Sequence, residues 1–90
     1  LPPTLRFVGE DAFRGCTSLR SLTLPVGLVD LRNRAFSGCR ALQEVILPPT
    51  VAYMGENVFA NCPKVTLKVP AGSKTEETLR LHGATAFETY

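Results

Sequence analysis

The sequence lacks most of the features that mark membrane insertion, export or nucleic-acid binding. No apolar run approaches the ~18 residues of a transmembrane helix, and no charged segment followed by an apolar one forms a signal peptide. Basic residues are not grouped, and the net charge is +2. The sequence therefore predicts no membrane span in this chain, no targeting signal, and no nucleic acid as the main partner.

Sites for catalysis, metals and nucleotides are missing as well. The three cysteines, Cys16, Cys39 and Cys62, lie 23 residues apart, so they form no C-x-x-C pair of the kind that binds zinc. No glycine-rich phosphate loop occurs. The single histidine, His82, has no nucleophile or orienting acid that the sequence would place beside it. We therefore expect no catalytic residue, no metal, no cofactor and no enzyme activity.

The composition is that of a folded chain. Hydrophobic residues make up 44% of the 90 residues and charged residues 20%, which is enough apolar mass for a core. This length corresponds to one domain or part of one. The first residue is leucine rather than methionine, which favours a fragment of a longer protein.

A repeat of 23 residues organises most of the sequence. Its three copies read LPPTLRFVGEDAFRGCTSLRSLT, LPVGLVDLRNRAFSGCRALQEVI and LPPTVAYMGENVFANCPKVTLKV. The copies align without a gap until the third loses one residue after Cys62, so that Leu67 and Val69 take the places of Leu22 and Leu24. We expect three repeats, at residues 1–23, 24–46 and 47–69.

The spacing of apolar residues predicts the shape of each repeat. Intervals of two, three and four residues fit neither a long helix nor a long strand, but they suit a coil that turns several corners. The segment Leu19-x-x-Leu22-x-Leu24 ends in alternation, which indicates a short strand that Pro25 ends. Alanine and phenylalanine before Gly15 indicate a turn of α- or 3₁₀-helix with a cap. Stacked coils would then pair their strands in parallel.

Stacking leaves three states of the cysteines to compare. Neighbouring coils would bring the Cα atoms of two cysteines to about 5 Å, within disulfide range. Parallel side chains in a ladder rarely reach the required dihedral angle, and three is an odd number. Free buried thiols are therefore favoured over one disulfide or a bound metal.

The last 21 residues, 70–90, leave the repeat and predict a cap. Ser73 and Glu76 form a capping box for a helix over about residues 74–82, and Gly83 suits its C-terminal end. Loose alternation over 84–90 indicates a final strand, with Ala84, Ala86 and Phe87 turned inward. This cap would cover the apolar end of the stack.

The repeats resemble the BspA-like, or Treponema-type, leucine-rich repeats, whose pattern is L-P-x-x-h-x-x-h-G-x-x-A-F-x-G-C-x-x-L-x-x-h-x, with h apolar. Repeats 1 and 2 match its Ala-Phe and Gly-Cys pairs, whereas repeat 3 has Val58 and Asn61 there. The resemblance implies an α/β solenoid: a right-handed coil of three leucine-rich repeats with a short parallel β-sheet and a helix-strand cap. It also implies a non-catalytic protein-protein interaction module of a surface or secreted protein that contacts host or cell-surface proteins.

Residues that alternate with the inward leucines and valines must point outward, and residues beside them flank the same strands. The resulting patch is either a contact surface for a protein partner or an ordinary solvated sheet face. Its members are Arg20, Ser21, Thr23, Gln43, Glu44, Ile46, Thr66 and Lys68.

A second contact candidate occupies one repeat position, at Phe7, Asp30 and Tyr53. If these side chains point outward, two aromatic rings flank a carboxylate; if they point inward, they belong to the core. We expect partial exposure, because a carboxylate is rarely buried without a partner.

The N-terminal end has no cap of its own, so Leu1 and Leu5 would face solvent or another repeat. The alternative function is therefore an intracellular or inter-domain scaffold that self-associates through this end.

Overall fold

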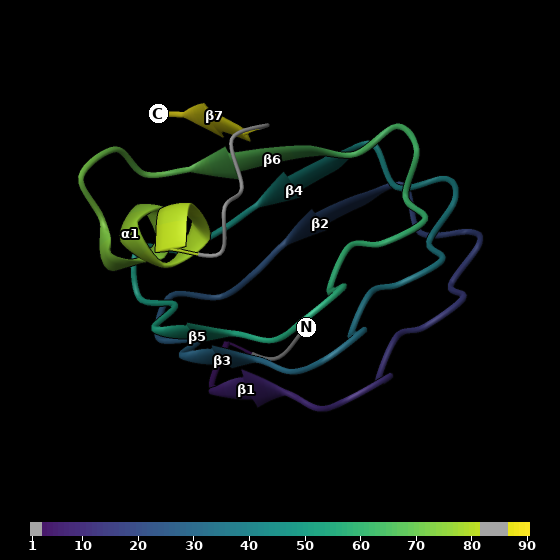
Figure 1. Cartoon of the computed structure of the whole chain (residues 1–90), viewed down its shortest axis with the longest axis horizontal. Coiled ribbons are helices and arrows are strands. Elements are labelled where there is room, and N and C mark those ends of the chain that lie inside the picture. Colours follow the sequence, from purple (N-terminus) through teal and green to yellow (C-terminus); the bar gives the residue numbers. More distant parts are fainter. Residues whose placement is uncertain (1–2, 82–86) are drawn as a thin grey trace.

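A computed structural model of the chain describes residues 3–81 and 87–90. The chain winds through three stacked coils, and each coil gives one strand to each of two parallel sheets (Figure 1). The short sheet has the order β1 (Phe7–Val8), β3 (Asp30–Leu31), β5 (Tyr53–Met54). The long sheet has the order β2 (Ser21–Thr23), β4 (Glu44–Ile46), β6 (Thr66–Val69), β7 (Phe87–Thr89). This is the expected α/β solenoid.

The long sheet follows the repeat residue by residue. Leu22 pairs with Val45, 23 positions on, and Val45 pairs with Leu67, which lies only 22 positions on. The third repeat is therefore one residue shorter, and its strand still pairs in the same register. The strands end just before Pro25 and Pro70, because proline offers no N–H group to a ladder.

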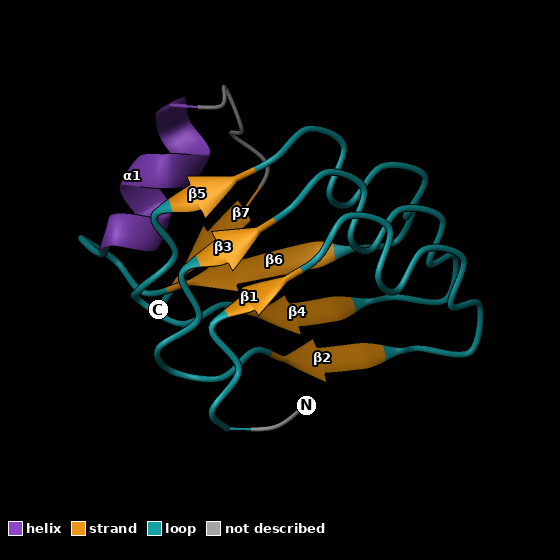
Figure 2. Cartoon of the chain, turned by 90° about the horizontal axis from the view of Figure 1, so that it is seen from below, coloured by secondary structure: helices purple, strands orange, loops and turns teal. Residues whose placement is uncertain are grey.

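The short sheet was not expected from the sequence, which predicted a strand on one side of the coil only. Figure 2 shows β1, β3 and β5 on the side of the stack opposite to β2, β4 and β6. Each strand of the short sheet has only two residues, Val8, Leu31 and Met54 being the buried ones. Two residues are too few to show alternation, so no pattern in the sequence indicated these strands.

In each coil, the segment that leads from the short-sheet strand to the long-sheet strand forms tight turns rather than the expected turn of helix. Asp11 and Gly15 both adopt positive φ, at 59° and 75°, and so do their counterparts in the other coils. A left-handed residue interrupts a right-handed helix. The N–H of Phe13 instead donates to the Ala35 carbonyl at 2.8 Å, and that of Phe36 to the Val58 carbonyl at 2.9 Å. These bonds join the coils to one another.

The second coil holds the centre of the core. Its inward side chains Phe36, Leu42 and Val45 have no exposed surface. The Phe36 ring stacks between Phe13 and Phe59, with centroids 5.1 and 5.6 Å away and planes within 2° and 6° of parallel. The corresponding side chains of the first coil are only half-buried, because no coil covers them on their outer side.

The cap consists of α1 (Lys74–Leu81) and β7, and it confirms the predicted helix and strand. The Glu76 N–H donates to Ser73 Oγ at 3.2 Å, as a capping box requires. The Glu76 carboxylate accepts from the Gly72 N–H rather than from the Ser73 N–H, because the latter donates to the Pro70 carbonyl. His82, Gly83, Ala84, Ala86 and Leu1 lie outside the described residues.

Thr75 fastens the helix to the last coil. Its hydroxyl accepts the Val51 N–H at 3.0 Å and donates to the Pro48 carbonyl. Thr78 adds a hydrogen bond from its hydroxyl to the Val51 carbonyl at 2.9 Å. The buried Leu79 packs into the core beside them. The two side-chain hydroxyls thus join the helix to the backbone of the third coil.

The cysteines are free thiols, as expected, with Cys39 and Cys62 buried and Cys16 half-buried. The Cys39 thiol donates to the Phe13 carbonyl at 3.3 Å and the Cys62 thiol to the Phe36 carbonyl at 3.2 Å. The cysteine column therefore ties each coil to the one before it. Burial raises the pKa of the Cys39 thiol above its usual range.

This shift predicts that Cys39 resists alkylation in the native chain. The folded state holds the thiol proton more tightly than the unfolded state does. The stability that this difference provides is present below the usual thiol pKa and is lost as the pH rises through the raised pKa of the folded state. Iodoacetamide at pH 8, followed by mass spectrometry, should modify Cys16 well before Cys39. Equal rates at the two cysteines would contradict the prediction.

Candidate functional site

The first candidate is the outer face of β2, β4 and β6, which we call the long-sheet face. The strand register places the predicted outward residues in two rows across the coils, Ser21–Glu44–Thr66 and Thr23–Ile46–Lys68. Ser21 and Thr23 are exposed and the other four are half-exposed. Arg20 and Gln43, both exposed, precede their strands and flank the rows. The structure thus brings together all eight predicted residues, whose role in binding stays a prediction.

The long-sheet face carries charges of both signs. Lys68 Nζ lies 3.0 Å from Glu44 Oε2 on the neighbouring strand. The hydrogen bond to Glu44 raises the pKa of the Lys68 ammonium, and the charge of Glu88 adds to the rise. Glu88 pairs in register with Lys68 and extends the second row onto β7. The sequence did not assign Glu88 to this face, because the final strand alternated too loosely to fix its orientation.

The replacement Glu44→Ala tests whether this face is a surface. We expect a change in the free energy of unfolding within about 0.5 kcal/mol, because exposed ion pairs contribute little and the strand pairing is untouched. Urea titration followed by circular dichroism measures it. A loss of several kcal/mol would mean that Glu44 supports the core.

The second candidate is the outer face of β1, β3 and β5, which we call the short-sheet face. Phe7, Asp30 and Tyr53 pair in register across it. Phe7 is 61% exposed and Tyr53 is 48% exposed. The expected partial exposure is confirmed. The Asp30 carboxylate has a partner, because Arg32 Nη2 donates a hydrogen bond to it at 3.2 Å.

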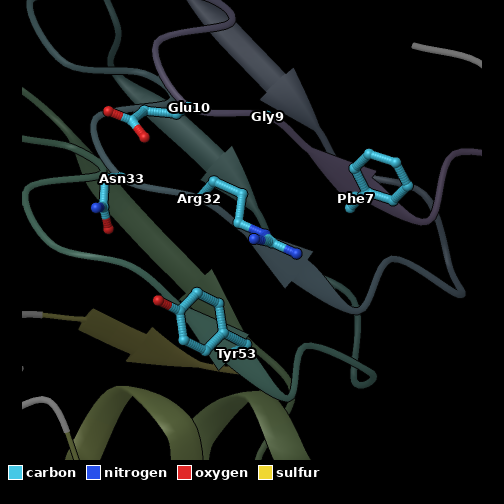
Figure 3. A pocket seen from close by; sticks show the side chains of 6 residues that line it. All are labelled: Phe7, Gly9, Glu10, Arg32, Asn33 and Tyr53. Atoms are coloured by element: carbon cyan, nitrogen blue, oxygen red, sulfur yellow. The ribbon is translucent and has the colours of Figure 1, made fainter.

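A hollow of about 330 Å³ lies on the short-sheet face (Figure 3). The Arg32 side chain crosses it between the rings of Phe7 and Tyr53, and Glu10 and Asn33 line the opposite side. The Arg32 guanidinium carbon is 5.7 Å from the centre of the Tyr53 ring, a cation–π distance. The sequence missed Arg32 and Asn33, since only the short sheet that it did not predict places them beside the aromatic rings.

Metal-ligating side chains do not gather on either face in the described part of the chain. Within residues 3–81 and 87–90, no three His, Cys, Asp or Glu side chains lie close enough together to hold a metal ion. The helix that the structure describes is too short and too polar to cross a membrane. The arrangement is suited to contact with another molecule through side chains fixed on strands.

Comparison with known proteins gives one match. The family model described as a BspA type leucine rich repeat region (6 copies) matches residues 1–88. No curated protein and no solved structure matches the chain.

Proposed function

This chain belongs to the BspA-type leucine-rich repeat family, and from that membership we propose that it is a non-catalytic module that binds proteins through its long-sheet face. The parent protein would lie at a cell surface or be secreted, and its partner would be a host or cell-surface protein. The observation that carries the proposal is the two in-register rows of outward side chains on three paired strands.

Rigid strands favour this use of the face. Backbone pairing fixes the position of Thr23, Ile46 and Lys68 before any partner arrives, so little conformational entropy is lost on binding. Ile46 supplies a half-buried apolar contact at the centre, and the Glu44–Lys68 pair surrounds it with charge. An apolar centre with a polar rim is the usual anatomy of a protein interface.

The test is a binding screen with a matched pair of variants. The immobilised chain is screened against extracellular-matrix proteins and cell-surface ectodomains. Thr23→Arg adds a charge to the exposed end of the second row, and Ala12→Arg adds the same charge at an exposed turn. We expect a binder whose affinity falls about tenfold with Thr23→Arg and stays unchanged with Ala12→Arg. A screen without a binder, or a binder insensitive to Thr23→Arg, would contradict the proposal.

A second candidate function is self-association of a scaffold through the N-terminal end. It is favoured by the half-exposed apolar residues of the first coil, Leu5, Phe13, Leu19 and Leu22, whose counterparts in the second coil are fully buried. Light scattering across a concentration series measures the mass of the chain. A species heavier than one chain that dissociates with Leu19→Asp would support this role, and a monomer at all concentrations would contradict it.

A further inference from the structure

The coil brings together three basic residues that are far apart in the sequence. Each coil makes a turn just before its strand of the long sheet, over residues 16–19, 39–42 and 62–65, and in each turn the last N–H donates to the first carbonyl at 3.1 to 3.2 Å. Arg40 and Lys64 lie in the second and third of these turns, and Arg20 directly follows the first. We call Arg20, Arg40 and Lys64 the basic corner. Two coil spacings of about 4.8 Å separate its first and last members along the stack.

The members of the basic corner have no partner within the described part of the chain. All three are exposed, and none forms an ion pair or a side-chain hydrogen bond with another described residue. Every other lysine or arginine except Arg6 lies within 4 Å of a carboxylate. Arg6 precedes β1 and lies beside Gly27. Three of the four unpaired cations therefore gather at one corner of the coil.

Negative charge is kept away from this corner. The segments that contain the turns, residues 12–20, 35–43 and 58–66, have no aspartate and no glutamate. Glu44 is the acidic residue closest to the corner in the sequence, and it pairs with Lys68 on the long-sheet face at 3.0 Å. The other acidic residues of the repeats belong to the first half of each copy: Glu10, Asp11, Asp30 and Glu56. The basic corner is therefore a surface of one sign, which attracts anions.

The neutral groups beside the cations are those that bind sugars well. Thr17, Ser18 and Gln43 are exposed, and their side chains form no hydrogen bond with another described residue. Hydroxyl and amide groups both donate and accept, as the hydroxyls of a sugar do. No aromatic residue occurs at 16–20, 39–43 or 62–66, so the corner has no ring on which a nucleic-acid base could stack.

We propose that the basic corner binds a sulfated polysaccharide that lies along the coil axis. The guanidinium groups of Arg20 and Arg40 can each donate two parallel hydrogen bonds to the oxygens of a sulfate, and the Lys64 ammonium adds a compact charge on the third coil. The sugar hydroxyls between the sulfates then bond to Thr17, Ser18 and Gln43.

The backbone of the corner favours a sugar chain over an acidic peptide. A peptide that adds to a protein by strand pairing needs free N–H and carbonyl groups at an edge. Here the Gln43 N–H donates to the Arg20 carbonyl and the Thr66 N–H to the Gln43 carbonyl, both at 2.8 Å. Recognition at this corner therefore depends on side chains and charge, which a sulfated sugar satisfies without a peptide backbone of its own.

The proposal goes beyond the protein contact of the long-sheet face. Arg40 and Lys64 lie outside that face, and the ligand is of another chemical class. Thr23→Arg tests the one site, and replacements of Arg40 and Lys64 test the other, so either proposal can fail without the other.

The experiment titrates the ¹⁵N-labelled 90-residue chain with a heparin hexasaccharide at low salt and follows the backbone amide spectrum. We expect saturable shifts concentrated at residues 16–20, 39–43 and 62–66, and much smaller ones with the same hexasaccharide after its sulfates are removed. Arg40→Gln and Lys64→Gln should each weaken binding about threefold, and the double variant about tenfold. A fourfold rise in salt concentration should also weaken binding about tenfold, because salt screens exposed charges.

The matched control is Arg6→Gln, which removes the same charge from an exposed and unpaired arginine elsewhere. The strands of the long sheet begin on the side of the turns, whereas β1, which follows Arg6, begins on the opposite side of the coil (Figure 2). We therefore expect Arg6→Gln to bind the hexasaccharide as the unaltered chain does. The amide spectrum of each variant shows whether it is folded, and all three replaced residues are exposed.

Four results would overturn the proposal. The first is the absence of saturable shifts at millimolar hexasaccharide, and the second is equal binding of the desulfated sugar. The third is a double variant that binds unchanged, or an Arg6→Gln variant that loses as much affinity as Arg40→Gln. The fourth is tighter binding of hexaglutamate or of a thymidine hexanucleotide at the same residues, which would assign the corner to an acidic peptide or to single-stranded nucleic acid.

Discussion

Replacing Phe36 by alanine is expected to lower the free energy of unfolding by about 3–5 kcal/mol. The ring has no exposed surface and lies between the rings of Phe13 and Phe59. Its removal leaves a cavity in the middle coil that neighbours on both sides cannot fill without breaking the bonds between coils. A chain of this length has about 5–13 kcal/mol of stability in total, so the variant is expected to be unfolded in part at 37 °C.

The outer ring Phe13 is the matched control. It is half-buried and, among the described residues, stacks on the Phe36 ring alone, so Phe13→Ala should lose clearly less stability than Phe36→Ala. Urea denaturation with circular dichroism gives both values on the same scale. A loss below 1 kcal/mol for Phe36→Ala, or equal losses for the two variants, would show that the ring column does not form the core.

The replacement Thr75→Val is expected to lower the free energy of unfolding by about 2–4 kcal/mol, although it hardly changes the volume of the side chain. The change leaves the Val51 N–H and the Pro48 carbonyl without the hydroxyl that bonds both. Both residues are buried, as is Thr75 itself. Unpaired buried backbone groups are costly, because water cannot replace the lost partner.

Thr75→Ser separates the hydroxyl from the methyl group. Serine keeps both hydrogen bonds and removes one buried carbon, so the expected loss is about 1 kcal/mol. Thermal or urea unfolding of the two variants makes the comparison. The hydroxyl would have no special role if valine were tolerated as well as serine is.

The parts of the fold predicted from sequence are those that repeat at a fixed interval or carry a local signal. Leu22 marked its strand because alternation precedes Pro25, and Ser73 marked the start of α1 because Glu76 follows three residues later. The short sheet gave no comparable signal with its two-residue strands. The positive φ of Asp11 and Arg34 was equally hidden, since neither residue type requires that conformation.

Of the two candidate sites, the sequence predicted one in full and the other only in part. The eight residues of the long-sheet face follow from alternation around known inward positions. The short-sheet face could be predicted only in its column of Phe7, Asp30 and Tyr53. Arg32 and Asn33 join it through the pairing of β3 with β1 and β5, which depends on contacts between coils rather than on neighbours in the chain.

The attachment of α1 and β7 to the third coil makes the two ends of the stack unequal. Thr75 and Thr78 occupy backbone groups beside β5, and β7 occupies the edge of β6. If copies of the chain associate through the open end, each copy has one such surface to offer. Two identical surfaces meet about a two-fold axis and close the assembly, whereas a filament needs two different, complementary ends. Association through two open ends is therefore expected to stop at a symmetric dimer.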